Sequence, residues 1–279
     1  MGIFERMGQG FSIGKRSLEV VWNDKSLMLF PVLSGVASIA TLAAFYFGIG
    51  PQRLESLIGS GERGGSPSPE AYALALGLYF GLFFITIFFN VALIGAASLS
   101  LDGKDTTLGD GINEAVRHLG SILAWSLISG TVGLLLSLIE NDRRGGRFIR
   151  SILGTAWTVI TYFVLPVLIF ENRNAFEAIG RSGQIMKQSW GEAAGARFSL
   201  GGLFFLAVLV AVLIAVGGMA INRQLAIPML ILAGCFLVFS AILFQTAKSV
   251  LTVALYRYAA GREAPKGFDR TLLESAFGP

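Results

Sequence analysis

The sequence has few charged residues. Only 14% of its 279 residues are Asp, Glu, Lys or Arg and 53% are hydrophobic, whereas soluble domains carry roughly 25% charged residues. Six segments contain no Asp, Glu, Lys, Arg or His: residues 26–52, 71–101, 119–139, 151–170, 198–222 and 224–247. About 20 apolar residues cross a bilayer core as a helix, whereas barrel strands are about 10 residues of alternating polarity. These runs exclude a β-barrel and predict an all-α integral membrane protein.

We expect a single membrane domain over residues 1–279. Its predicted transmembrane helices lie near residues 27–50, 72–100, 119–139, 151–170, 198–221 and 225–247. Residues 1–25 have the spacing of an amphipathic helix in the membrane interface, and 248–279 form a predicted cytoplasmic tail. Amphipathic stretches at 105–120 and 172–195 also precede the third and fifth spans. This pattern favours three helical hairpins, each with an interfacial lead-in.

The distribution of Lys and Arg predicts the orientation. With the N-terminus inside, the cytoplasmic connections receive fourteen of these residues and the other side receives seven, with Lys248 left out. Positively charged loops stay in the cytoplasm. We therefore expect a multi-pass protein of the prokaryotic plasma (inner) membrane with both termini in the cytoplasm. The four arginines of residues 141–150 are the main exception.

Other absences narrow the function. Cys235 is the only cysteine, so the chain forms no internal disulfide, and we expect this residue to be a small buried hydrophobe. The sequence lacks a phosphate-binding Gly-rich loop and a G-x-S-x-G nucleophile motif. No acidic residue lies deep in a predicted span, where ion-coupled carriers usually need one. We expect no catalytic residue, cofactor or metal, and no nucleic-acid partner.

Three stretches resemble a known group of proteins. They are DKSLMLFPVLSG at residues 24–35, ITYFVLPVLIFENRNAFEAIGRSGQIMKQSW at 160–190, and LYRYAAGREAPKGFDRTLLESAF at 255–277. In the second, Pro166 precedes Glu171, an Arg181–Ser182 pair and Trp190. Together they resemble a family of uncharacterised prokaryotic membrane proteins, distantly similar to the membrane domain of some glycerophosphodiester phosphodiesterases. The resemblance implies six membrane helices and supplies no catalytic residues.

Lys248 is the one cation within an otherwise apolar helical run. Residues 225–247 are long enough to cross the membrane alone, so we expect Lys248 at the cytoplasmic end of the last span. Residues 249–260 would then form an amphipathic extension in the interface. The predicted membrane-interface anchors are Trp22, Lys248, Tyr256, Arg257 and Tyr258. An ion or substrate site at Lys248 is the alternative, because lysine in hydrocarbon is costly and often functional.

Weaker signals lie elsewhere. Asp110, Glu114 and His118 would share a helix face at metal-ligand spacing, although solvated interfacial residues are the simpler interpretation. Gly77 and Gly81 match a small-residue packing pattern, and Pro166 and Pro228 predict modest kinks. A transporter would line a polar cavity with spanning-segment side chains: Thr86, Asn90, Ser126, Ser129, Thr158, Thr161 and Gln245. A lipid-acting enzyme would need Glu171 to join Asp110, Glu114 and His118.

The lack of ionisable groups in the spans, together with the amphipathic lead-ins, favours a non-enzymatic membrane protein. We expect a scaffold, an accessory subunit of a membrane assembly, or a lipid-organising factor. Its partners would be the lipid bilayer and possible further membrane subunits or copies of itself. A small-molecule or lipid transporter is the alternative.

Overall fold

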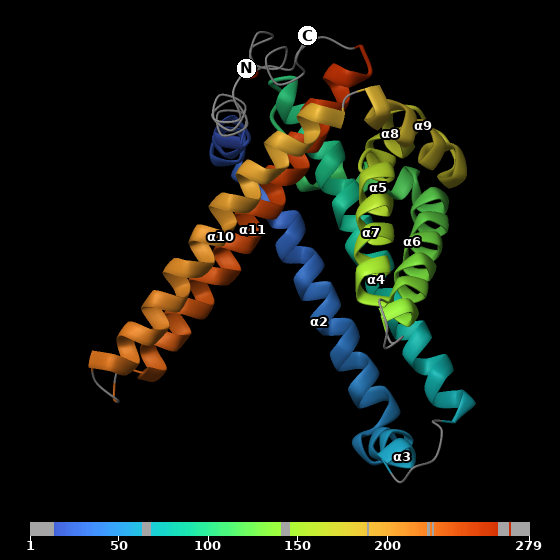
Figure 1. Ribbon diagram of the computed structural model, residues 1–279, viewed down its shortest axis with the longest axis vertical. Helices are drawn as coiled ribbons and strands as arrows, with labels where there is room; N and C mark the ends of the chain where they lie inside the picture. The colour runs from blue at the N-terminus through green and yellow to red at the C-terminus, as the bar shows by residue number, and fades with distance from the viewer. Residues whose placement is uncertain are drawn as a thin grey trace.

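The computed structural model describes residues 14–62, 68–140, 146–188, 190–221, 224, 226–261 and 268. All regular structure in these residues is helical, which confirms the predicted all-α class. Six helical segments in this described part are long and apolar enough to cross a membrane: Lys25–Ile49, Pro69–Leu101, Leu119–Ile139, Gly146–Phe170, Leu200–Gly218 and Ala226–Ala259. Residues 14–23 and the last turns of the final helix lie at the same end of the molecule, the upper end in Figure 1.

The first hairpin consists of η1 (Lys25–Met28), α2 (Leu29–Ile49), α3 (Pro51–Glu62) and α4 (Pro69–Leu101). Helix α4 begins where the Ser68 hydroxyl accepts a bond from the Ala71 N–H at 3.2 Å, with proline at its first position. This cap satisfies a backbone donor that the first turn of a helix leaves without a partner. The 33 residues of α4 are about 50 Å long, so the helix is longer than a bilayer core of about 30 Å.

The second hairpin consists of α5 (Leu108–Arg117), α6 (Leu119–Glu140), α7 (Gly146–Ile160) and α8 (Val164–Phe170). The third consists of α9 (Ala175–Gln188), α10 (Trp190–Ile221) and α11 (Ala226–Ala259). Short helices thus precede α2, α6 and α10, over residues 14–23, in α5 and in α9. This is the arrangement that the amphipathic stretches predict.

The core lies towards the upper end. Residues 91–98 of α4 and 249–256 of α11 are buried, and α11 packs against α4, α2, η1 and α8. Residues 249–256 of the predicted amphipathic extension are thus buried on all sides rather than on one face, and the position of residues 249–260 in the interface stays a prediction. In a bilayer, lipid tails are as apolar as leucine, so an apolar pattern does not distinguish a helix face in the core from one in lipid.

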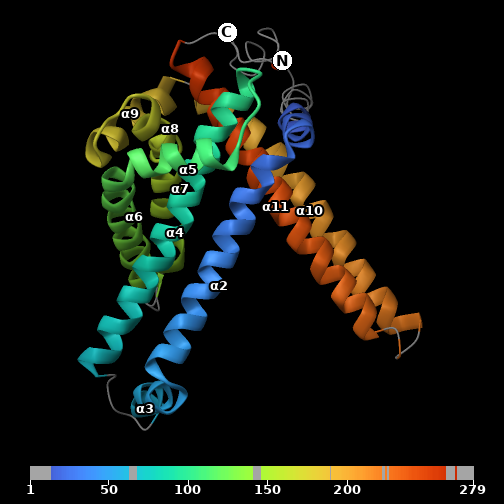
Figure 2. The ribbon, with the colours of Figure 1, turned by 180° about the vertical axis from the view of Figure 1, so that it is seen from behind.

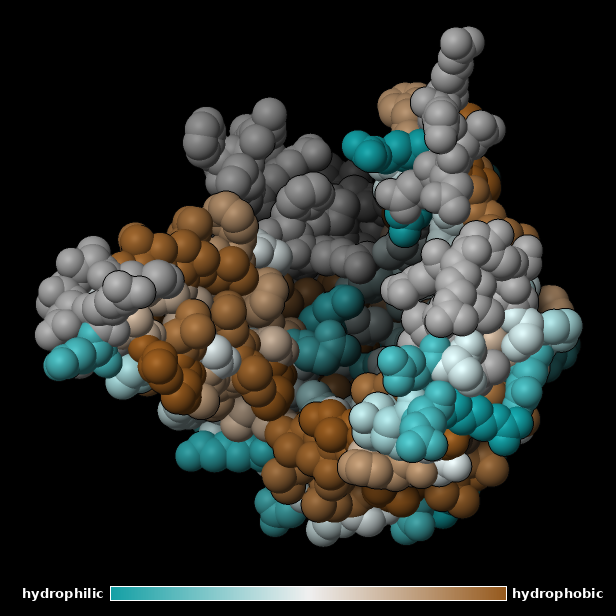
Figure 3. Space-filling model, turned by 90° about the horizontal axis from the view of Figure 1, so that it is seen from below, coloured by the Kyte–Doolittle hydropathy of each residue, from teal (hydrophilic) through white to brown (hydrophobic). Residues whose placement is uncertain are grey.

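Below this core the helices separate into two arms. Helices α10 and α11 run side by side and diverge from α2 and α4 towards the lower end, which gives the molecule the outline of an inverted V (Figures 1 and 2). Seen from below, the surface is hollowed between the arms, and hydrophilic residues lie deep in the hollow (Figure 3). From here on, α10 and α11 together are called "the α10–α11 arm".

The fourth span is broken rather than modestly kinked. Helix α7 ends at Ile160, a turn covers residues 161–163, and α8 begins at Val164. The ring of Pro166 excludes the carbonyl of Tyr162, four residues earlier, from the helix hydrogen-bond pattern. The Ser182 hydroxyl bridges the break, since it accepts from the Phe163 N–H at 2.9 Å and donates to the Ile160 carbonyl at 2.6 Å. Pro228, in contrast, lies in the first turn of α11.

Three small residues do not pack as predicted. A Cβ added at Gly77 or Gly81 would meet no described atom within 4 Å, so this glycine pair forms no close contact with the helices that the structure describes. Cys235 is exposed on α11 rather than buried. Close approaches of α4 occur instead at Gly111, where a Cβ would overlap the Ala92 carbonyl oxygen, and at Gly130, where it would overlap the Phe80 ring.

Candidate functional site

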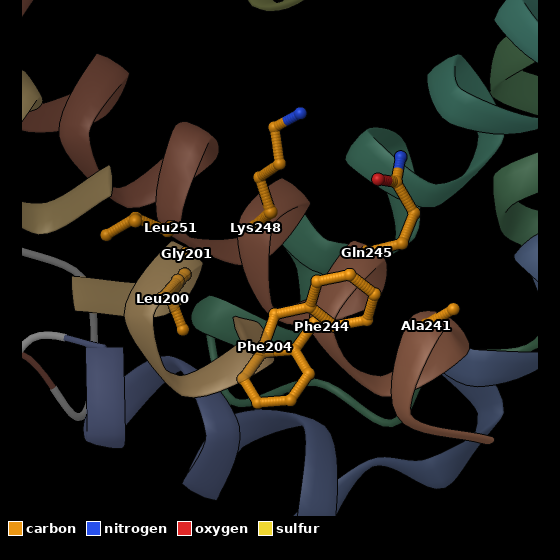
Figure 4. Close-up of a pocket in the computed structure, with 8 residues that line it drawn as sticks. All are labelled: Leu200, Gly201, Phe204, Ala241, Phe244, Gln245, Lys248 and Leu251. Atoms are coloured by element: carbon orange, nitrogen blue, oxygen red, sulfur yellow. The ribbon is translucent and has the colours of Figure 1, made fainter. Parts of the chain in front are cut away.

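The candidate site is a cavity of about 510 Å³ on the α10–α11 arm. It is lined by Leu200, Gly201 and Phe204 of α10 and by Ala241, Phe244, Gln245, Lys248 and Leu251 of α11 (Figure 4). Cavities that bind small molecules typically measure about 300–1,000 Å³ and are mostly apolar with a few polar groups. The size and the lining therefore suit an apolar ligand with one polar end.

Two features of the sequence create the space and its apolar wall. Gly201 has no side chain, and a Cβ at this position would meet no described atom within 4 Å. Phe204 and Phe244 meet edge to face across the two helices, with ring centroids 5.7 Å apart, a favourable arrangement for an aromatic pair. Gly201 thus leaves the cavity open beside an aromatic wall.

The polar edge of the cavity comes from α11. The Gln245 amide donates to the Oδ1 of Asn90 on α4 at 3.0 Å, and the Asn90 amide donates to the Thr86 carbonyl at 3.0 Å. Lys248 follows Gln245 by three residues, so the two side chains share a helix face. Figure 4 shows both side chains extending to the same side of α11. The cavity therefore carries an amide and an ammonium group at one edge.

Lys248 does not end its helix, because α11 continues to Ala259. It lies nine residues before Arg257, about 14 Å along the helix at 1.5 Å per residue. Arg257 pairs with Asp102, directly after α4, at 2.5 Å and donates to the Ser98 carbonyl at 3.0 Å. Lys248 is thus well inside the line of ionic groups at the upper end, and its role as an interface anchor stays a prediction.

The other predicted anchors have different surroundings. Tyr256 is fully buried, so its side chain does not face lipid in this chain. Its ring stacks on Phe170 at 5.5 Å and its hydroxyl donates to Glu171 at 3.1 Å. Trp22 is 59% exposed and lies 5.4 Å from the Lys25 ammonium in a cation–π contact. Arg257 and Tyr258 are partly buried.

Glu171 is the centre of an ionic cluster at the upper end. Arg173 lies 2.7 Å from its carboxylate and Arg181 lies 2.9 Å from it. Burial alone would raise the pKa of Glu171, but the bonds from Arg181, Arg173 and Tyr256 outweigh burial and lower it. The single carboxylate of Glu171 is shared by the two arginines and Tyr256, and the cluster therefore connects the end of α8 to α9 and α11.

The possible metal ligands on α5 have local roles. Asp110 forms a capping box with Thr107, whose hydrogen bonds lower the pKa of Asp110. The His118 Nδ1 lies 2.9 Å from the Glu114 carbonyl oxygen. Among the described residues, no group of three or more His, Cys, Asp or Glu side chains could hold a metal ion. Glu171 bonds to the arginines and Tyr256 described above rather than to this group.

The polar side chains predicted for a transporter cavity do not gather. Those that donate to a backbone carbonyl of their own helix are Thr86, Asn90, Ser126, Ser129, Thr158 and Thr161. Within the described part of the chain, the bond between Asn90 and Gln245 is the one that joins members of the set from two different helices. The sequence flagged Lys248 and Gln245 but not the apolar wall, because that wall depends on the pairing of α10 with α11.

Comparison with known families matches residues 70–267 to the family of unknown function DUF6159. The chain belongs to this family. The match runs from α4 through α11 and therefore includes every residue that lines the cavity. No curated protein and no solved structure matches the chain. The predicted likeness to an uncharacterised membrane-protein family is thereby supported, and the distant similarity to the membrane domain of glycerophosphodiester phosphodiesterases stays a prediction.

Proposed function

We propose that the protein is a non-enzymatic lipid-organising factor of the prokaryotic inner membrane, with both termini in the cytoplasm. The observation that carries the proposal is the divergence of the α10–α11 arm from α2 and α4, with an apolar cavity on that arm. Within a bilayer core there is no water to fill such a space, and protein surfaces are not left facing a void. We therefore expect lipid hydrocarbon to occupy it.

The surface of the arm supports the same proposal. Large hydrophobic side chains are exposed along both helices, among them Phe205, Leu206, Leu213, Val216, Ile227, Leu230, Ile231, Val238 and Phe239. Exposed apolar surface of this extent marks a membrane or protein contact. The arm is joined to the rest of the chain mainly at the upper end, through α11, so lipid has access to it along most of its length.

The alternatives make different demands. A small-molecule transporter needs polar groups that converge, and the side chains expected for that role mostly bond to their own helices. A scaffold or accessory subunit would fill the space between the arms with helices of another chain or of a second copy. The apolar surface of the arm suits that role as well. Lipid between the arms would therefore support the lipid-organising factor, and protein helices between them would support the scaffold or subunit.

Native mass spectrometry of protein released gently from its own membrane tests the proposal. We expect one chain or a homo-oligomer that retains lipid after bulk lipid is removed. Additional polypeptides at fixed stoichiometry, without retained lipid, would replace the proposal with a scaffold or accessory subunit. If the purified protein retained no lipid and then moved a solute across the membrane of reconstituted liposomes, the transporter would be favoured.

A further inference from the structure

We propose that the cavity on the α10–α11 arm binds one anionic phospholipid. An acyl chain would lie against Phe204 and Phe244, and the phosphate would meet the ammonium group of Lys248. The inference rests on the proposed lipid-organising function and names the ligand of that function.

The apolar part of the site fits a hydrocarbon chain. Leu200, Phe204 and Phe244 present aliphatic and aromatic carbon to a volume of about 510 Å³, which is within the range of small-molecule sites. Burial of an acyl chain gains free energy in proportion to the apolar area removed from water. Within a bilayer the gain is smaller, because lipid already surrounds the chain. Close packing therefore retains the chain, and the headgroup supplies selectivity.

The charge of the site selects the headgroup. Lys248 is the one ionisable residue of the eight that line the cavity, and its side chain is exposed there. The Lys248 ammonium can donate a charge-assisted hydrogen bond to a phosphate oxygen, and such bonds are stronger than those between neutral groups. A zwitterionic headgroup carries its own ammonium group, and that group competes with Lys248 for the lipid phosphate. The preferred ligand is therefore a phospholipid with a net negative charge.

The depth of Lys248 makes the site distinct from ordinary headgroup contacts. Arg257 is about 14 Å further along α11 and already contacts Asp102 and Ser98. A phospholipid held by Lys248 would therefore sit deeper than one held at the level of Arg257. Gln245 of the cavity lining faces α4 through its bond to Asn90, so lateral entry between the arms would give a lipid access to Lys248. The protein would thereby displace a lipid from its usual depth, which is one way to organise a membrane.

The test counts bound lipid on the full-length protein. Nanodiscs would contain equal amounts of phosphatidylglycerol and phosphatidylcholine, and native mass spectrometry would count lipids that remain after bulk lipid is removed. Lys248→Met removes the charge at similar length, and Lys248→Arg keeps it. Gly201→Leu fills the cavity. Gly202→Leu is the matched control, since a Cβ at either glycine meets no described atom within 4 Å but only Gly201 lines the cavity.

We expect the wild type to retain one phosphatidylglycerol in preference to phosphatidylcholine. Lys248→Met should lower this preference about tenfold, the magnitude of a lost charged hydrogen bond, while Lys248→Arg and Gly202→Leu keep it. Gly201→Leu should remove the retained lipid. Matching helical circular dichroism and unfolding midpoints for all variants would show that lost binding is not lost folding.

Two results would overturn the inference. One is a preference for phosphatidylglycerol that survives Lys248→Met, and the other is equal lipid retention by Gly201→Leu and Gly202→Leu. In either case, retained lipid on every variant would leave the lipid-organising function intact and place the lipid elsewhere. If the wild type retained no lipid at all, the proposed function would fail together with the inference.

Discussion

The Gln245 amide donates a hydrogen bond to Asn90 at 3.0 Å and thereby joins α11 to α4 across 155 positions of the sequence. The bond lies below the buried segment of α11, four residues before Ser249, where the α10–α11 arm begins to separate from the rest of the chain. It also lies beside the cavity, because Gln245 is part of the lining. The Asn90–Gln245 bond therefore fixes α11 against α4 at the same place where Gln245 shapes the candidate site.

A double-mutant cycle with Asn90→Leu and Gln245→Leu should reveal a coupling of about 0.6–1.7 kcal/mol, the range measured for side-chain hydrogen bonds between membrane helices. The measurement is the free energy of unfolding in mixed micelles. Thr86→Ala paired with Gln245→Leu is the control, since the Thr86 hydroxyl bonds to the Leu82 carbonyl within α4. Strict additivity of the two leucine substitutions would contradict the prediction.

Ser182→Ala should destabilise the protein by about 1–3 kcal/mol, the cost of leaving a buried polar group without its partner. The substitution removes the acceptor of the Phe163 N–H and a donor to the Ile160 carbonyl, and Ser182 is fully buried. Thr155→Ala is the control, because that exposed hydroxyl bonds only within its helix, to Ser151. Equal unfolding midpoints for the two variants would show that Ser182 does not hold the break.

The six spans and the short lead-in helices could be predicted from the sequence, because both depend on local patterns. A run without charge fixes a span, and the Thr107–Asp110 capping box marks the start of α5. The break in the fourth span does not follow from the sequence, because Pro166 alone predicts only a kink. The break itself is stabilised by Ser182, which comes from another helix.

The candidate site could be predicted only in part. Lys248 is visible as a cation in an apolar run, but the aromatic wall of its cavity requires α10 to lie beside α11. The burial of Tyr256 does not follow from the sequence for a related reason. An aromatic residue near a helix end is typical of the membrane interface, and only the packing of α8 and α11 reveals that Phe170 and Glu171 surround it.

The ionic cluster predicts a loss of stability in acid. Its bonds lower the pKa of Glu171 from the ordinary value of 4.5. The folded state therefore favours the ionised form of this side chain more than the unfolded state does. The stabilisation is present above pH 4.5 and is lost as the pH falls through the lowered pKa of the folded state. The difference in unfolding free energy between wild type and Glu171→Gln should therefore shrink below pH 4.5. A difference that stays constant from pH 6 to about pH 2 would contradict the assignment.

The orientation of the chain can be tested with the single cysteine removed. In a Cys235→Ala background, Arg53→Cys places a thiol on α3 and Lys104→Cys places one in the connection after α4, at opposite ends of α4. A maleimide that cannot cross membranes should label Arg53→Cys in intact cells, and Lys104→Cys only after permeabilisation. The parent Cys235→Ala protein controls for background labelling. The reverse pattern would place the termini outside the cytoplasm.

The most direct test of the central claim is an electron cryomicroscopy map of the protein in nanodiscs formed from its own membrane. The account predicts elongated lipid density between the α10–α11 arm and α4, with one chain against Phe204 and Phe244 and a headgroup near Lys248. Helices of another polypeptide in that space, or an α10–α11 arm packed against α2 along its whole length without lipid between them, would contradict it.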